Sequence, residues 1–112
     1  MSDIYNTDDL KLHRSNTLMG LHKTYAKLAT CTLNQWALSF KHNKANIIKS
    51  VQMAKEMGAT YRLGPELEIP GYSCEDHFFE PDTELHSWQI LGEMLSDKLL
   101  TKDILCDFGM PV

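Results

Sequence analysis

Residues 25–64 read YAKLATCTLNQWALSFKHNKANIIKSVQMAKEMGATYRLG, and this stretch decides the fold class. Residues 25–33 have the length of a strand, are rich in β-forming and apolar residues, and contain no Gly or Pro. After Lys27 the strand has few polar residues to place on either of its two faces, which is typical of a central strand. A helix is expected next, with Asn43 as its N-cap and Gly58 at the left-handed position after its end. The apolar residues at helical spacing are Ile47, Val51 and Ala54.

Working outward, residues 61–64 form a second expected strand, which Pro65 ends because proline has no N–H to donate to a ladder. Asp82 is the expected N-cap of a second helix, and residues 103–109 are the expected third strand. The expected apolar stripe of this helix comprises Leu85, Trp88, Leu91 and Leu95. The predicted fold class is therefore α/β, in the order β-α-β-α-β with parallel strands.

Three strands and two helices cannot cover both faces of a parallel sheet, so we expect some hydrophobic surface to be left exposed. Residues 1–26 are polar and lack a sustained period, and we expect a disordered amino-terminal arm there. The overall length of 112 residues allows one domain at most.

Composition excludes several classes of function. The chain has 11 Lys and Arg against 15 Asp and Glu, a net charge of −4, which argues against a nucleic-acid partner. No apolar run approaches the length of a membrane span, and the first residues fit neither a secretory signal nor a transit peptide. Three widely spaced cysteines do not form a disulfide framework. We expect a soluble, cytoplasmic protein with no membrane partner.

We expect neither a catalytic nor a metal-binding role for the cysteines. Cys31 and Cys106 fall inside expected strands, where a free cysteine behaves as a small apolar residue. Cys74 lies near the turn described next, but a catalytic thiolate needs a base and an electropositive setting. These three residues and His77 include no Cys-x-x-Cys pair, so we expect no metal site. Asp76, beside His77, receives no role from the sequence.

The turn at residues 64–72, GPELEIPGY, is the densest functional candidate. Glu66 comes directly after the carboxyl end of the second strand, where open α/β sheets place catalytic groups. Proline before it and the Pro-Gly pair after it restrict the backbone, so this carboxylate is held and could serve as a general base. On spacing alone, an acidic surface turn is the more common interpretation.

Four segments carry a resemblance to a known family. They are ATCTLNQWAL at 29–38, YRLGPELEI at 61–69, GYSCEDH at 71–77 and CDFGMPV at 106–112. Together they resemble the beginning of the eukaryotic glutamine-dependent NAD synthetases, within the nitrilase superfamily. The resemblance covers residues 27–112 and implies the amino-terminal part of a carbon–nitrogen hydrolase (glutaminase) domain, truncated. The implied fold is an incomplete nitrilase-type α-β-β-α sandwich.

The resemblance also implies an activity, that of an ATP-using ligase and amidotransferase of NAD biosynthesis. In this family a Glu-Lys-Cys triad hydrolyses glutamine, and the ammonia reaches a synthetase domain where ATP, with magnesium, drives amidation of nicotinate adenine dinucleotide to NAD. Glu66 matches the general base, and Tyr72 matches a residue that lines the glutamine pocket, although it could only pack the turn.

The Lys and Cys of the triad match no residue of this chain. We therefore expect the segment to bind no cofactor and to be inactive alone, whereas the full-length enzyme is expected to form a homo-oligomer. The alternative is a non-catalytic truncated chain, either an association module or an incomplete gene product.

Overall fold

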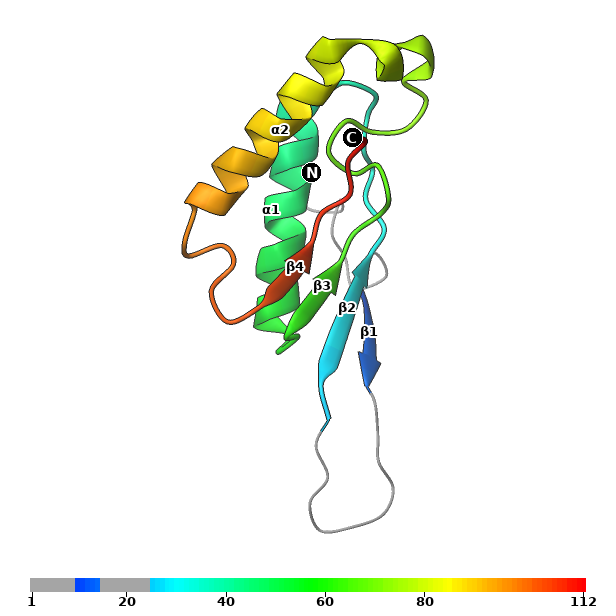
Figure 1. Ribbon diagram of the computed structural model, residues 1–112. Helices are drawn as coiled ribbons and strands as arrows, with labels where there is room; N and C mark the ends of the chain where they lie inside the picture. The colour runs from blue at the N-terminus through cyan, green and yellow to red at the C-terminus, as the bar shows by residue number, and fades with distance from the viewer. Residues whose placement is uncertain (1–9, 15–24) are drawn as a thin grey trace.

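The computed structural model describes residues 10–14 and 25–112, which form a small sheet with two α-helices and a 3₁₀ helix (Figure 1). The elements are β1 (Leu10–Arg14), β2 (Lys27–Cys31), α1 (Phe40–Glu56), β3 (Tyr61–Leu63), the 3₁₀ helix η2 (Glu75–Phe79), α2 (Pro81–Ser96) and β4 (Leu105–Asp107). Among the described residues, no helix is long and apolar enough to cross a membrane.

The four strands form one sheet in the order β1-β2-β3-β4. β2, β3 and β4 run parallel, which confirms the α/β class and the expected β-α-β-α-β order. The strands are shorter than expected, because β2 ends at Cys31 and β4 spans only Leu105–Asp107.

β1 is the element that the sequence did not predict. Residues 10–14 lie in the expected disordered arm, yet they pair antiparallel with β2, so the expectation is wrong for these five residues. The physical reason is the free edge of β2, whose backbone N–H and C=O groups need partners that a neighbouring extended segment supplies. Residues 1–9 and 15–24 of the arm lie outside the described residues.

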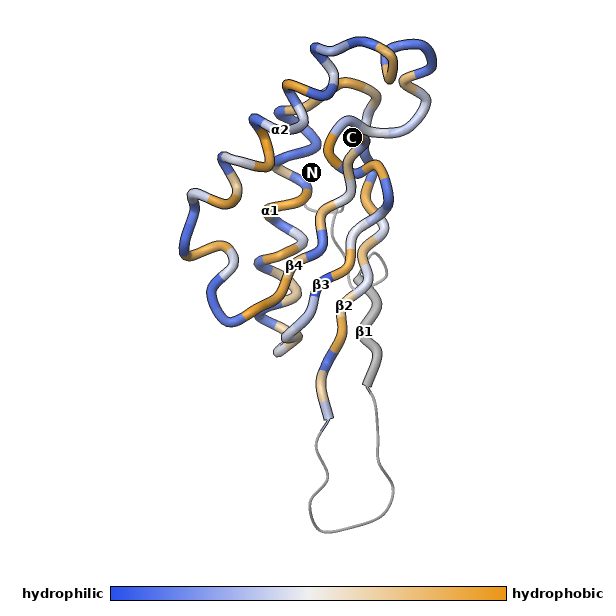
Figure 2. Tube along the Cα trace, viewed as in Figure 1, coloured by the Kyte–Doolittle hydropathy of each residue, from blue (hydrophilic) through white to orange (hydrophobic). Residues whose placement is uncertain are grey.

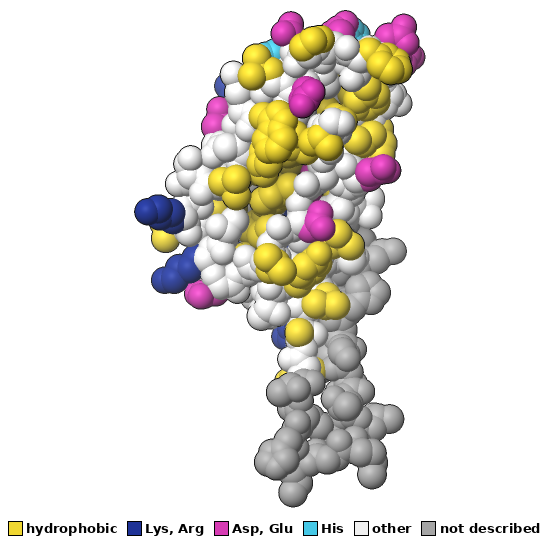
Figure 3. Space-filling view, viewed as in Figure 1, with side chains coloured by type: hydrophobic (Ala, Val, Ile, Leu, Met, Phe, Trp, Pro, Cys, Tyr) yellow, Lys and Arg dark blue, Asp and Glu magenta, His cyan; other side chains and the backbone are white. Residues whose placement is uncertain are grey.

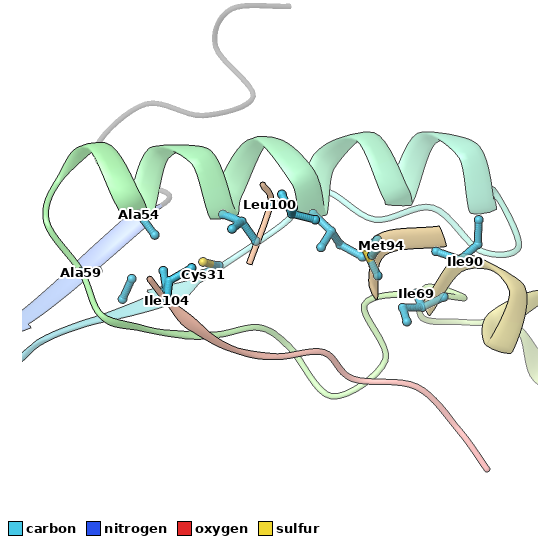
Figure 4. Close-up of a cluster of buried hydrophobic side chains, with 11 residues drawn as sticks. Cys31, Ala54, Ala59, Ile69, Ile90, Met94, Leu100 and Ile104 are labelled. Atoms are coloured by element: carbon cyan, nitrogen blue, oxygen red, sulfur yellow. The ribbon is translucent and has the colours of Figure 1, made fainter. Parts of the chain in front are cut away.

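The hydrophobic core lies between α1 and one face of the sheet (Figure 4). Apolar and polar residues alternate around α1 (Figure 2), and its apolar side packs on Ala29 and Cys31 of β2. Ile90 and Met94 of α2 also belong to the cluster, together with Ala59, Ile69, Leu100 and Ile104 from the connecting segments. Because side chains alternate along a strand, the neighbours of these buried strand residues point to the opposite face of the sheet.

That opposite face carries exposed leucines. Leu28, Leu63 and Leu105 are 39%, 40% and 65% exposed. Leu28 and Leu105 flank Tyr61 in the register of β2, β3 and β4, so they form a row across the sheet. Figure 3 shows hydrophobic side chains gathered on the visible face of the molecule. This agrees with the expectation of uncovered hydrophobic surface. The prediction that residues 25–33 form a central strand is confirmed, because β2 lies between β1 and β3.

Both helix starts differ from the sequence prediction. α1 begins at Phe40 with Ser39 as N-cap, and Asn43 is a buried residue of its first turn whose side chain binds loop backbone. α2 has Glu80 as N-cap and begins at Pro81, which is suited to a first helical position because it has no N–H to leave unpaired. Asp82 is therefore inside the first turn. The predicted end of α1 is confirmed, since Gly58 has φ +81°.

α2 also buries a different face from the expected one. Its buried residues are Thr83, Ser87, Ile90 and Met94, whereas Leu85, Trp88 and Leu95 of the expected stripe are exposed. The hydroxyls of Thr83 and Ser87 donate to the carbonyls of His77 and Thr83, both at 2.7–2.8 Å, so these small polar residues are buried without loss of hydrogen bonds. Periodicity alone does not distinguish two adjacent faces of one helix.

We predict that the 112-residue chain binds a hydrophobic dye such as ANS through the uncovered sheet face. Leu28→Thr with Leu105→Thr should reduce dye fluorescence while changing the free energy of unfolding little, because both leucines are already exposed. Val51→Ala, at a fully buried position, is the contrast and should cost about 1–3 kcal/mol in a urea titration. A sharply melting monomer that binds no dye would contradict this account.

Candidate active site

The turn that follows β3 lies at the carboxyl end of the parallel strands. The Ile69 N–H donates to the Gly109 carbonyl at 3.1 Å, and the Gly71 N–H donates to the Leu67 carbonyl at 2.9 Å. Glu66 is exposed at this turn, and within residues 10–14 and 25–112 its carboxylate has no hydrogen bond or ion pair. The backbone is thus tied down while the carboxylate faces solvent, an arrangement available for proton transfer.

Gly109 packs directly against the backbone of the turn. A Cβ atom at this position would lie 2.1 Å from the Glu66 carbonyl oxygen and 2.2 Å from that of Pro65. Side chains do not make such contacts with backbone atoms, so this position admits glycine alone unless the turn moves. The chain that leaves β4 therefore helps to fix the position of Glu66.

Beneath the turn lies a fully buried ion pair between Arg62 and Glu68. Arg62 Nη1 donates to Glu68 Oε1 at 2.9 Å, and Nη2 donates to Oε2 at 2.7 Å. Both side chains are completely inaccessible to solvent. The Gly109 N–H adds a third donor to Oε1 at 3.1 Å. This bidentate geometry suits an ionised carboxylate, because each of the three groups bonded to the Glu68 oxygens is a hydrogen-bond donor.

Burial raises the pKa of Glu68, while the hydrogen bonds and charge of Arg62 and the Gly109 N–H act in the opposite direction. The Arg62 guanidinium remains charged at any ordinary pH. Glu68 is fully buried and its carboxylate is hydrogen-bonded to Arg62 and Gly109, so it is not accessible to a substrate. Glu66, two residues earlier, is exposed and accessible. The structure therefore separates a solvent-facing carboxylate from a buried one.

Tyr72 lies beside the same turn. Its hydroxyl oxygen accepts a hydrogen bond from the Leu67 N–H at 3.3 Å, and the residue is 44% exposed. The ring thus packs the turn and also presents surface next to Glu66. Its neighbour Gly71 has φ +87°, and a Cβ atom there would meet the Trp36 carbonyl oxygen at 2.5 Å.

Sequence reasoning missed a network of amide side chains that joins the loop after β2 to this turn. Asn43 accepts from the Trp36 N–H at 2.9 Å and donates to the carbonyls of Trp36 and Ile69 at 2.8 and 3.0 Å. Gln35 donates to the Glu68 carbonyl at 2.7 Å and accepts from Asn46 at 2.8 Å. The available signal was the run of amide residues in 34–46, whose buried members must find partners.

The other residues considered in the sequence, Cys74 and His77, make contacts that do not involve Glu66. Cys74 is buried, and its thiol donates to the Gly71 carbonyl at 3.2 Å. His77 Nδ1 lies 3.0 Å from Glu80, whose hydrogen bond and charge raise the pKa of the exposed imidazole. Within residues 10–14 and 25–112, no cluster of three or more His, Cys, Asp or Glu residues could hold a metal ion.

The parallel sheet with helices packed on it defines an α/β protein, and Glu66, restrained and solvent-facing after β3, is its candidate functional residue. The carbon–nitrogen hydrolase family model matches residues 27–102. The chain therefore belongs to the carbon–nitrogen hydrolase family.

Curated relatives give a narrower match. The chain is 66% identical over 85 residues to a glutamine-dependent NAD(+) synthetase of Dictyostelium discoideum and 58% identical over 85 residues to that of Homo sapiens. Each alignment covers 76% of this chain and 12% of the relative, so the chain spans about an eighth of their length.

A solved structure has the same fold. The glutamine-dependent NAD(+) synthetase of Cytophaga hutchinsonii matches with a TM-score of 0.68 at 25% identity, over 74% of this chain and 14% of that one. The similarity places the sheet and helices described above in a nitrilase-type fold.

Gly109 and Gly92 form a matched pair for testing the close contact at the turn. Gly109→Ala should destabilise the chain by about 1–3 kcal/mol, because the methyl group overlaps the carbonyls of Pro65 and Glu66. Gly92→Ala meets no atom within 4 Å in α2 and should stabilise it by up to about 1 kcal/mol. Urea unfolding of both variants is the measurement, and equal effects would contradict the contact.

Thiol reactivity tests the inert role assigned to the cysteines. Burial raises the pKa of Cys31, Cys74 and Cys106, so little reactive thiolate forms near neutral pH. We expect slow alkylation by iodoacetamide at pH 7.5, increasing as the pH rises and increasing sharply in urea, followed by mass spectrometry. Alkylation of native Cys74 at the rate of a free cysteine would show instead an activated thiol.

Proposed function

We propose that these residues belong to the glutamine-hydrolysing domain of a glutamine-dependent NAD synthetase and that Glu66 is its general base. Glutamine is the proposed substrate of this domain. Its ammonia would serve the ATP- and magnesium-dependent amidation of nicotinate adenine dinucleotide in a synthetase domain. The full enzyme is proposed to be a homo-oligomer.

The observation that carries the proposal is the contrast between the two carboxylates of the turn. Glu66 is exposed on a backbone held by Gly109, whereas Glu68 is fully enclosed by Arg62. A general base must reach a substrate or a nucleophile within hydrogen-bond distance and must be held in place, and only Glu66 meets both requirements. The high identity to synthetases supports the same assignment.

The chemistry assigned to Glu66 is proton transfer. In the proposed reaction, its carboxylate takes the proton of a cysteine thiol, and the thiolate attacks the carboxamide carbon of glutamine. The resulting carboxylic acid returns the proton to the departing nitrogen, which leaves as ammonia, and the enzyme holds a thioester. Water, activated by the same carboxylate, then releases glutamate. Tyr72, next to Glu66, is proposed to line the glutamine pocket.

Glu66→Gln in the complete enzyme is the direct test. The change preserves shape but removes the proton acceptor, and we expect glutamine-driven NAD formation to fall about 10²- to 10⁴-fold. NAD formation from supplied ammonia should survive, because it does not require glutamine hydrolysis. Equal loss of both rates would mean that Glu66 maintains the fold.

The matched control is Glu84→Gln, an exposed glutamate of α2, which should leave both rates unchanged. Glu68→Gln is a poor control because breaking a buried ion pair costs about 3–5 kcal/mol. A normal glutamine-driven rate in Glu66→Gln would refute the assignment of the base.

A further inference from the structure

Arg62 is a buried arginine that the proposed mechanism does not use. Its side chain points from β3 to the α1 side of the sheet and is completely inaccessible. An arginine is rarely buried unless its donors are paired, so its partners indicate what the burial achieves.

Each N–H of the Arg62 guanidinium has an acceptor. Nε and Nη2 donate to Ser50 Oγ at 3.1 and 2.8 Å, and Ser50 in turn donates to the Ile47 carbonyl within α1. Nη1 donates to the Asp107 carbonyl at 3.1 Å, at the end of β4. The remaining two N–H groups bind Glu68. One guanidinium therefore joins α1, β3, β4 and the turn.

The Glu68 carboxylate fixes the turn at two further points. It lies so close to Gly64 that a Cβ atom there would be 2.2 Å from Oε1, and it accepts from the Gly109 N–H. In the sequence, Gly64 lies two residues before Glu66 and Glu68 lies two residues after it. Gly109 packs on the Glu66 carbonyl. The Glu68 carboxylate thus contacts both Gly64 and Gly109, which lie beside Glu66.

We propose that the Arg62–Glu68 pair is a positioning device that sets where the Glu66 carboxylate points, with Ser50 anchoring it to α1. The pair moves no proton itself. This inference rests on the proposed function, since it assigns the means by which the base of that site is held. Small displacements of a catalytic group can lower a rate strongly while binding is retained.

The test replaces the pair by apolar side chains of similar size, Arg62→Met with Glu68→Leu, in the complete enzyme. Such replacements can preserve or increase stability, so folding and positioning become separable. We expect glutamine-driven kcat to fall on the order of 10- to 100-fold. The KM for glutamine should change less than about threefold, and ammonia-driven NAD formation should be unchanged. A merely structural role would instead lower both rates together with the folded fraction.

A second variant covers the case in which the double replacement does not fold. Ser50→Ala removes the α1 anchor and leaves the ion pair, and it should lower the glutamine-driven kcat several-fold with the same unchanged KM. In the 112-residue chain, hydrogen exchange at the Ile69 and Gly109 amides should be about tenfold faster in this variant, with Val51 in α1 unaffected.

Comparison with Glu66→Gln distinguishes this proposal from the proposed function. If Glu66→Gln abolishes glutamine-driven activity while folded apolar-pair and Ser50→Ala enzymes retain full kcat, the positioning role is refuted and the base assignment stands. If Glu66→Gln retains full activity, the base assignment fails, and the positioning role fails with it.

Discussion

The guanidinium of Arg62 lies where four parts of the chain meet, and burying its charge is possible only because every donor is satisfied. Removing two opposite charges from water costs several kcal/mol per ion, which the attraction between Arg62 and Glu68 offsets only with good geometry and further hydrogen bonds. Ser50, the Asp107 carbonyl and the Gly109 N–H supply those hydrogen bonds. The requirements of this pair therefore restrict residues that are distant in sequence.

The same pair explains why two glutamates separated by one residue have different environments. The turn after β3 brings Glu68 under the sheet edge, where its charge is neutralised, and leaves Glu66 in solvent. Because Arg62 compensates the charge of Glu68, Glu68 adds little electrostatic repulsion to the exposed Glu66 carboxylate. The buried charge of Glu68 is therefore compensated inside the protein by Arg62, while Glu66 remains in solvent.

Amide side chains hold the other side of the site. Asn43 and Gln35 bind the backbone of the loop after β2 and of the turn after β3, which would otherwise bury unpaired polar groups. Two loops at the carboxyl end of the sheet are therefore rigidly joined. Such loops carry function in open α/β folds because the strands beneath them are fixed.

The sequence by itself determined the α/β class, the βαβ unit, the end of α1 at Gly58 and the location of Glu66 after a strand. These follow from local rules, since periodicity, glycine conformation and strand ends depend on neighbouring residues. The family resemblance, carried by contiguous motifs such as RLGPELE, was also available from sequence. The role of Glu66 came from that resemblance, because spacing favoured a surface turn.

Long-range packing determines which face of α2 is buried, that Asn43 binds a loop instead of capping a helix, and that residues 10–14 pair with β2. It alone paired Arg62 with Glu68 and placed Gly109 against Glu66. These features depend on contacts between segments that are distant in sequence, such as Gly109 and Glu68, which are 41 residues apart. No local propensity encodes such contacts, because the free energy of a buried polar group is set by the partners that folding brings to it.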